Sequence, residues 1–218
     1  MNKFFNPLVI SFSSLYLIGL AFSLLSWPGA SIMMLLGCVG IALGSIIYDG
    51  IMKRNLGRCA LHLGFAAGLF TILSRLYYWD NSVIYAFVSI LLFALGLYKA
   101  EEKHSKLACW VTALVVTIGV LLNAVPSCYI YQFIHYYVSD EQEIDEDNSY
   151  WIHNKYSFFL AMNSDYDKAL HYIDASYKCA ERYSYSSFDM PKEVVLKKIE
   201  ENRKCIEKRD LTNFDVHL

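Results

Sequence analysis

The stretch Leu107-Ala-Cys-Trp-Val-Thr-Ala-Leu-Val-Val-Thr-Ile-Gly-Val-Leu-Leu-Asn-Ala-Val125 contains no charged residue, and Pro126 follows it directly. A helix needs roughly 20 apolar residues to cross the ~30 Å hydrocarbon core of a bilayer. The stretch therefore predicts a membrane-spanning helix. The chain before it is mostly apolar and the chain after it is polar, so the side on which this helix ends decides the location of the last part of the protein.

The composition excludes an ordinary soluble domain. Of the 218 residues, 56% are hydrophobic and only 18% are charged. The charge is also divided unevenly: residues 1–138 carry eight Lys or Arg against four acids, whereas residues 139–218 carry eleven against seventeen. This division indicates an acidic, water-exposed domain attached to a membrane-embedded one.

Five apolar runs approach or reach the length that a membrane crossing needs. They cover residues 8–26, 31–48, 60–78, 82–98 and 107–125. Trp27-Pro28-Gly29 and Asp80-Asn81 form short turns between neighbouring runs, which makes those helices antiparallel. The sequence therefore predicts an all-α fold, in which a polytopic bundle of five transmembrane helices occupies residues 1–126.

Basic residues flank these runs on one side only. Seven lie there: Lys3, Lys53, Arg54, Arg58, Lys99, Lys103 and Lys106. The two turns on the opposite side carry none. Because Lys and Arg are enriched in cytoplasmic loops, we expect a cytoplasmic N-terminus in the cytoplasmic (inner) membrane. Five crossings then place the C-terminal domain in the periplasm or otherwise outside the cytoplasm.

Residues 127–148 connect the bundle to the last domain. Residues 127–138 have one apolar helical face, but this segment is too short to span a membrane. It either extends the fifth helix past Pro126 or lies in the outer interface. Residues 140–147 then hold six acids in eight positions. This run is expected to be a solvated linker, with attraction of a basic partner as the alternative.

Residues 149–218 are predicted to be helical, over about 149–162, 165–182 and 189–209, with Pro191 in the first turn of the third helix. Within this domain, residues 154–180 resemble one tetratricopeptide (TPR) repeat. The matching positions are Leu160 in the first helix, the turn at Ser164 and Asp165, Tyr166, Ala169, Ile173 and Ser176. The sequence departs from the repeat where His153 replaces Trp, where Ser157 and Ser164 replace Gly, and at Glu181, where no Pro closes the unit. A simple αα-hairpin is the alternative.

The TPR resemblance implies binding of another protein, with Tyr156 and Asn163 exposed as partner-binding residues. Stacked repeats usually need three or more units to bury a core. The hairpin is therefore expected to pack on the third helix, on the 127–138 segment or on a partner.

Arg75 is the only charged residue well inside an apolar run. We expect Arg75, Asp80 and Asn123 to form a polar cluster near the outer ends of the third and fifth spans, with an ion-pathway role for Arg75 as the alternative. Small residues in the pairs Gly40/Gly44 and Gly64/Gly68 allow close helix packing. These faces pack within the monomer or, alternatively, form an oligomer interface.

The sequence carries no HExxH, GxSxG or phosphate-binding glycine loop, and no Cys/His metal spacing. No catalytic residue, cofactor, metal site or nucleic-acid partner is therefore predicted, and an enzymatic role is unsupported. We expect a membrane-embedded protein whose outward helical domain binds another, possibly basic, protein. The alternatives are an immunity protein that neutralises a membrane-targeting toxin, and a channel or transporter subunit.

Overall fold

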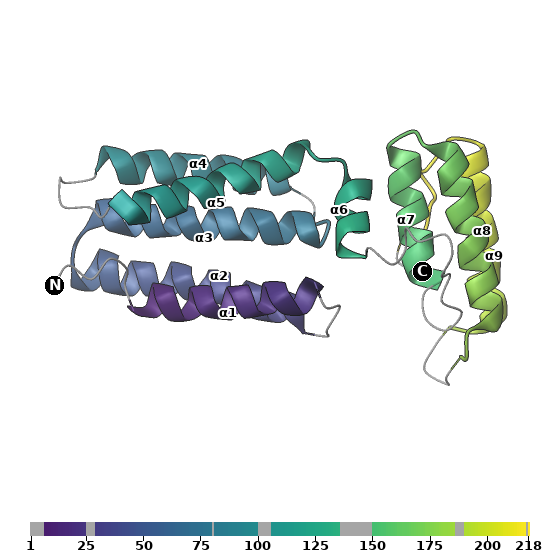
Figure 1. Ribbon diagram of the computed structural model, residues 1–218, viewed down its shortest axis with the longest axis horizontal. Coiled ribbons are helices and arrows are strands. Elements are labelled where there is room, and N and C mark those ends of the chain that lie inside the picture. The colour runs from purple at the N-terminus through teal and green to yellow at the C-terminus, as the bar shows by residue number, and fades with distance from the viewer. Residues whose placement is uncertain are drawn as a thin grey trace. The chain divides into compact units, whose positions relative to one another are not determined.

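The computed structural model describes residues 7–24, 29–79, 81–99, 106–135, 150–185, 190–216 and 218. All regular secondary structure in these ranges is helical (Figure 1). In chain order the helices are α1 (Pro7–Leu24), α2 (Ala30–Gly44), the π-helix η1 (Ser45–Met52), α3 (Leu56–Leu76), α4 (Ser82–Tyr98), α5 (Lys106–Ala124), α6 (Ser127–Ile134), α7 (Tyr150–Met162), α8 (Tyr166–Arg182) and α9 (Lys192–Glu207). The chain divides into two compact units, Met1–Val125 and Pro126–Leu218.

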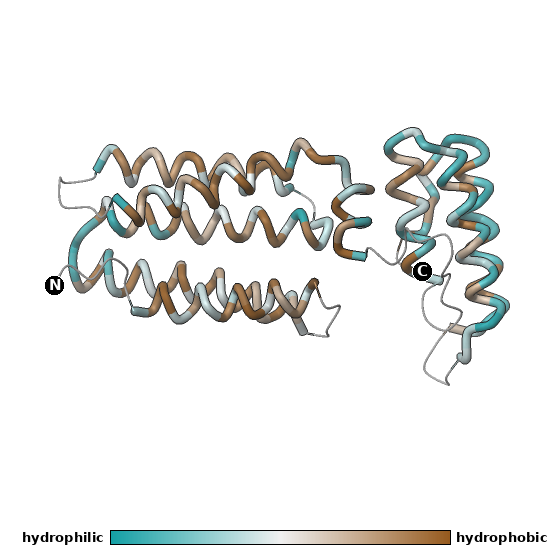
Figure 2. The backbone as a smooth tube through the Cα atoms, in the orientation of Figure 1, coloured by the Kyte–Doolittle hydropathy of each residue, from teal (hydrophilic) through white to brown (hydrophobic). Residues whose placement is uncertain are grey.

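Four helices of the first unit are long and apolar enough to cross a membrane. They are α1, the continuous helix α2–η1 (Ala30–Met52), α3 and α5. Figure 2 shows hydrophobic residues along the whole length of these helices. Helix α4 is equally apolar but has 17 residues, which gives it a length of about 26 Å at the α-helical rise. The fifth crossing therefore stays a prediction.

Helix α3 is the central helix of this unit and packs against α2, α4 and α5. Of the residues in its most apolar 18-residue stretch, 67% are buried, whereas the corresponding value is 22% for α1 and for α5. The core that α3 shares with α1 and α2 includes Tyr16, Met34, Ile41 and Leu73. The Tyr16 hydroxyl donates a hydrogen bond to the Leu69 carbonyl at 2.9 Å, so its one polar atom is satisfied inside an apolar core.

The glycine pairs lie where helices of this unit approach one another closely. A Cβ on Gly40 would overlap the Phe12 ring, and one on Gly44 would lie 3.0 Å from Leu8 Cβ, so this pair faces α1. A Cβ on Gly64 would lie 2.9 Å from the Phe93 backbone nitrogen of α4, and one on Gly68 would lie 3.0 Å from a Val115 methyl group of α5. Both pairs thus meet other helices of the same chain, and not each other.

Two boundaries differ from those predicted. The second span does not end near Tyr48 but continues as a π-helix to Met52, and α3 begins at Leu56 instead of residue 60. Asn55 explains the early start, because its side-chain oxygen accepts a hydrogen bond from the Arg58 backbone nitrogen at 2.9 Å and caps the helix. The link between the two spans is therefore only residues 53–55.

In the second unit, α7 and α8 form a hairpin, α9 packs on α8, and α6 packs on α7. Ser164 adopts a left-handed conformation in the hairpin turn (φ 64°), and Asp165 caps α8. Asn202 of α9 donates a hydrogen bond to the Asn154 side chain of α7 at 2.8 Å, and both donate to the Asp215 carbonyl. This buried amide network connects α7, α9 and the C-terminal segment.

Helix α6 is not a continuation of α5. Pro126 has an extended backbone (φ −56°, ψ 143°), which ends the helical hydrogen bonding before Ser127. Of the two alternatives for residues 127–138, the interfacial position therefore stays a prediction, and a helix that continues through Pro126 is not observed. The acidic run 140–147 lies outside the described residues.

Candidate functional site

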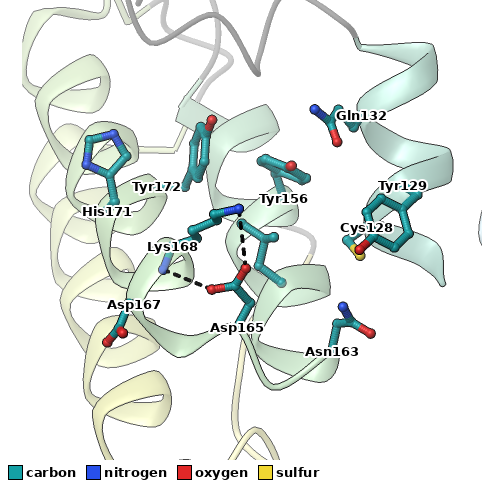
Figure 3. Close-up of a pocket in the computed structure, with 11 residues that line it drawn as sticks. Cys128, Tyr129, Gln132, Tyr156, Asn163, Asp165, Asp167, Lys168, His171 and Tyr172 are labelled. Atoms are coloured by element: carbon teal, nitrogen blue, oxygen red, sulfur yellow. Dashed lines mark hydrogen bonds and ion pairs between the residues drawn. The ribbon is translucent and has the colours of Figure 1, made fainter.

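The second unit contains a pocket of about 400 Å³ between α6, α7 and α8 (Figure 3). Its lining combines aromatic, amide, acidic and basic side chains: Cys128, Tyr129 and Gln132 from α6, Tyr156, Leu160 and Asn163 from α7, and Asp165, Asp167, Lys168, His171 and Tyr172 from the turn and α8. Both residues predicted to bind a partner, Tyr156 and Asn163, line this pocket.

Helical spacing explains why each helix contributes several residues to the pocket. Tyr156, Leu160 and Asn163 stand at positions i, i+4 and i+7 of α7, and therefore share one face. Lys168 and Tyr172 are likewise i and i+4 on α8. Because the tight turn at Ser164 makes α7 and α8 antiparallel neighbours, these two faces meet beside α6.

Tyr156 is not exposed, contrary to the prediction, since only 5% of its surface is accessible. Its ring stacks on Tyr131 of α6 at 5.9 Å and meets Tyr172 edge-on at 4.7 Å. The prediction assumed an open inner face of the hairpin, whereas α6 covers that face. Burial raises the pKa of the Tyr156 hydroxyl to about 12, with smaller contributions from Tyr172, Cys128 and Asp165. Tyr156 is therefore a neutral phenol that forms part of the pocket wall.

Charged side chains lie at the mouth of the pocket. Asn163 is exposed at the end of α7. Asp165 accepts a hydrogen bond from the Lys168 backbone nitrogen at 3.4 Å, and its carboxylate lies 3.7 Å from the Lys168 ammonium. Figure 3 shows both interactions between Lys168 and Asp165. Sequence reasoning placed Asp165 in the hairpin turn but missed its place, and that of Lys168 and Tyr172, in a pocket.

In the first unit, Arg75 binds the end of α5. Its Nε and Nη2 donate hydrogen bonds to the carbonyls of Leu122 (3.1 Å) and Val125 (2.7 Å). A cation at a helix C-terminus stabilises the unpaired carbonyls there. Asn123 instead accepts a hydrogen bond from the Ser82 hydroxyl at 2.6 Å. Asp80 lies outside the described residues, so of the predicted cluster the structure places Arg75 and Asn123 at the same end of α5, with different partners.

A second buried polar group was missed by sequence reasoning. Asp49 of η1 and His62 of α3 are both inaccessible to solvent, and His62 Nδ1 lies 2.8 Å from the Asp49 carboxylate. Arg58 Nε lies 3.1 Å from the other carboxylate oxygen. The sequence contained an indication of this polar group, because Arg58 and His62 stand at positions i and i+4 and therefore share a helical face. Asp49 stands at the end of an apolar run, where it resembled an interfacial residue.

Neither the pocket nor the buried polar groups of the first unit form a metal site among the described residues. Among the described residues, no three His, Cys, Asp or Glu side chains are placed to hold one metal ion. No protein-family model, curated protein or solved structure matches the chain. Its function is therefore inferred from the structure of the two units.

Proposed function

We propose that this protein is a non-enzymatic integral membrane protein whose C-terminal helical domain binds a partner protein through the pocket between α6, α7 and α8. The observation that carries the proposal is the pocket itself. Helices α7 and α8 contribute side chains to it from faces that the hairpin brings together, and α6 supplies the opposite wall. Aromatic, amide and charged groups converge there, as they do at protein recognition sites.

The chemistry of the pocket favours recognition over catalysis. Its only thiol, Cys128, lines the same pocket as His171 and two aspartates, residue types that some cysteine hydrolases use. Burial, however, raises the pKa of the Cys128 thiol, which keeps it protonated. A nucleophilic cysteine needs the opposite shift, because the thiolate is the reactive form. We therefore assign Cys128 a packing role in the pocket wall.

The TPR-like sequence pattern supports the same proposal. In TPR-like hairpins the inner face of the two helices carries the ligand-binding side chains, and here that face lines the pocket. The membrane bundle anchors the domain at the bilayer, and the proposed orientation has a cytoplasmic N-terminus and the domain outside. A membrane-targeting toxin as the partner would make the protein an immunity protein.

A photo-crosslinking amino acid at position 163 tests this proposal in the full-length protein in native membranes. We expect it to cross-link one protein specifically, whereas the same amino acid in place of the exposed Glu200 on α9 does not. A second control carries Asn163→Arg with the cross-linker at position 168, and its yield should fall. Equal cross-linking from positions 163 and 200, or none from 163, would refute a binding role for the pocket.

A further inference from the structure

We infer that the pocket between α6, α7 and α8 receives a single lysine or arginine side chain from the partner protein. This inference rests on the proposed function and specifies the chemistry of the partner. It follows from the composition of the pocket walls, from the position of Lys168 and from the charge of the domain.

Three tyrosines line the pocket, and each comes from a different helix: Tyr129 from α6, Tyr156 from α7 and Tyr172 from α8. The rings of Tyr156 and Tyr172 lie 4.7 Å apart and are nearly perpendicular (71°), so they form two adjoining walls. Aromatic rings attract ammonium and guanidinium groups through the negative potential of their faces, and sites that bind such cations are commonly built from several rings. A long aliphatic stem also suits such apolar walls.

Two carboxylates, Asp165 and Asp167, complete the lining at the start of α8. Asp165 is held in place because it also caps that helix. Lys168 and His171 are the two lining residues that can carry positive charge. The lining thus holds two acidic side chains against one lysine, a composition that favours a cation over an anion.

Lys168 indicates how an ammonium group is accommodated. Its side chain reaches from α8 toward the part of the pocket where Tyr156 and Tyr172 lie (Figure 3). The ion pair with Asp165 is long, at 3.7 Å, and 70% of the Lys168 side chain is accessible. Such a pair is weak in water. A partner's cation can therefore displace Lys168 from Asp165, and the displaced side chain moves into solvent.

The charge of the domain agrees with this choice of partner. Residues 139–218 have eleven basic and seventeen acidic residues, so the domain attracts a basic protein from a distance. The pocket volume of about 400 Å³ fits one extended side chain and its neighbouring backbone, and is too small for a helix. We therefore assign recognition to one inserted residue of a basic segment.

The test uses the full-length protein in nanodiscs and peptides of the form acetyl-Ala-Ala-X-Ala-Ala-amide, with X as lysine, arginine, norleucine or glutamate. NMR titration gives the dissociation constants. We expect the lysine and arginine peptides to bind about tenfold more tightly than the norleucine peptide, which has the same stem without the charge. Equal affinities, or preference for glutamate, would overturn the inference.

Four variants locate the effect. Asp165→Asn removes the charge but keeps a residue that caps helices well, and it should weaken binding of the lysine peptide about tenfold. Glu200→Gln removes a negative charge outside the pocket and should leave binding of the lysine peptide unchanged. Tyr172→Phe should retain the preference for lysine, because the ring face remains. Lys168→Met should tighten binding, because the competing cation is gone. Weaker binding of the lysine peptide by Lys168→Met would contradict the proposed displacement of Lys168 from Asp165.

The two proposals fail separately. A partner cross-linked at position 163, together with equal affinity for the lysine and norleucine peptides, would overturn the cation site and leave the binding role intact. Selective binding of the lysine peptide without any cross-linked partner would refute the binding role in the membrane and retain the cation site.

Discussion

His62 Nδ1 lies 2.8 Å from the carboxylate of Asp49, and neither side chain is accessible to solvent. The two residues belong to different spans, η1 and α3, which are joined by a link of only three residues. Arg58, which is partly exposed, forms an ion pair with the other oxygen of the Asp49 carboxylate. The pair therefore fixes the register of the two helices on either side of the link. Asp49 itself lies in the π-helix η1, where the backbone departs from regular α-helical hydrogen bonding.

We expect Asp49→Ala to destabilise the full-length protein by roughly 3–5 kcal/mol, because it leaves His62 and Arg58 without their buried acceptor. The free energy of unfolding can be measured in mixed detergent micelles by tryptophan fluorescence. In a double-mutant cycle with His62→Leu, the coupling energy should be about 1–3 kcal/mol. Met52→Ala, at an exposed position of the same π-helix, is the control and should have little effect. A coupling energy near zero would contradict the proposed register role.

Gly64 and Gly50 provide a matched pair for testing helix packing in the first unit. A Cβ on Gly64 would lie 2.9 Å from a backbone nitrogen of α4, which cannot move without shifting that helix, whereas one on Gly50 would lie 3.4 Å from the Cys59 sulfur. Gly64→Ala should therefore cost about 1–3 kcal/mol of unfolding free energy. Gly50→Ala should cost much less under the same conditions. If the two alanine variants are equally stable, the close approach of α3 and α4 is not a determinant of stability.

The positions of the helices could be predicted from the sequence because each depends on local patterns. The apolar runs and the turn at Ser164 and Asp165 predicted helices within a few residues of those observed. The Asp49–His62 pair and the pocket could not be predicted in the same way, since both depend on how separate helices pack. Tyr156 illustrates the difference. Its helix was predicted, and the 127–138 segment was one of three expected packing surfaces, but no local pattern shows that α6 covers Tyr156.

We expect His153 to make the second unit sensitive to acid. This residue is 4% exposed, and burial lowers its pKa from 6.5 to about 4, with a smaller contribution from His171. Below pH 6.5 the unfolded chain therefore binds a proton that the folded chain does not. The unit should lose stability as the pH falls from 6.5 to 4, by roughly 3 kcal/mol from His153. His135, whose pKa burial also lowers to about 4, acts in the same direction.

Hydrogen exchange of α7 and α8, corrected for the intrinsic effect of pH, measures this loss locally in the full-length protein. His153→Phe keeps an aromatic ring against Tyr172 and removes the titrating group, so its protection should depend less on pH. The residual dependence should fall further in the double variant with His135→Phe. An unchanged pH dependence in His153→Phe would show that other groups cause the acid sensitivity.

Cys205 provides a reporter for the proposed topology. It is the one partly exposed cysteine of the second unit, because Cys128 and Cys179 are buried, and all six cysteines of the chain are free thiols. Burial and the nearby Asp210 raise the pKa of the Cys205 thiol, so labelling is best performed at about pH 8, where more of the reactive thiolate is present.

If the second unit lies outside the cytoplasm, a membrane-impermeant maleimide should label intact cells at Cys205, and Cys205→Ser should abolish most of that labelling. Lys53 is exposed in the link between η1 and α3, on the side proposed to be cytoplasmic. In a Cys205→Ser background, Lys53→Cys should therefore react only after the membrane is permeabilised. Labelling of Lys53→Cys but not of Cys205 in intact cells would show the opposite topology. The partner-binding pocket would then face the cytoplasm, and its basic partner would have to be sought there.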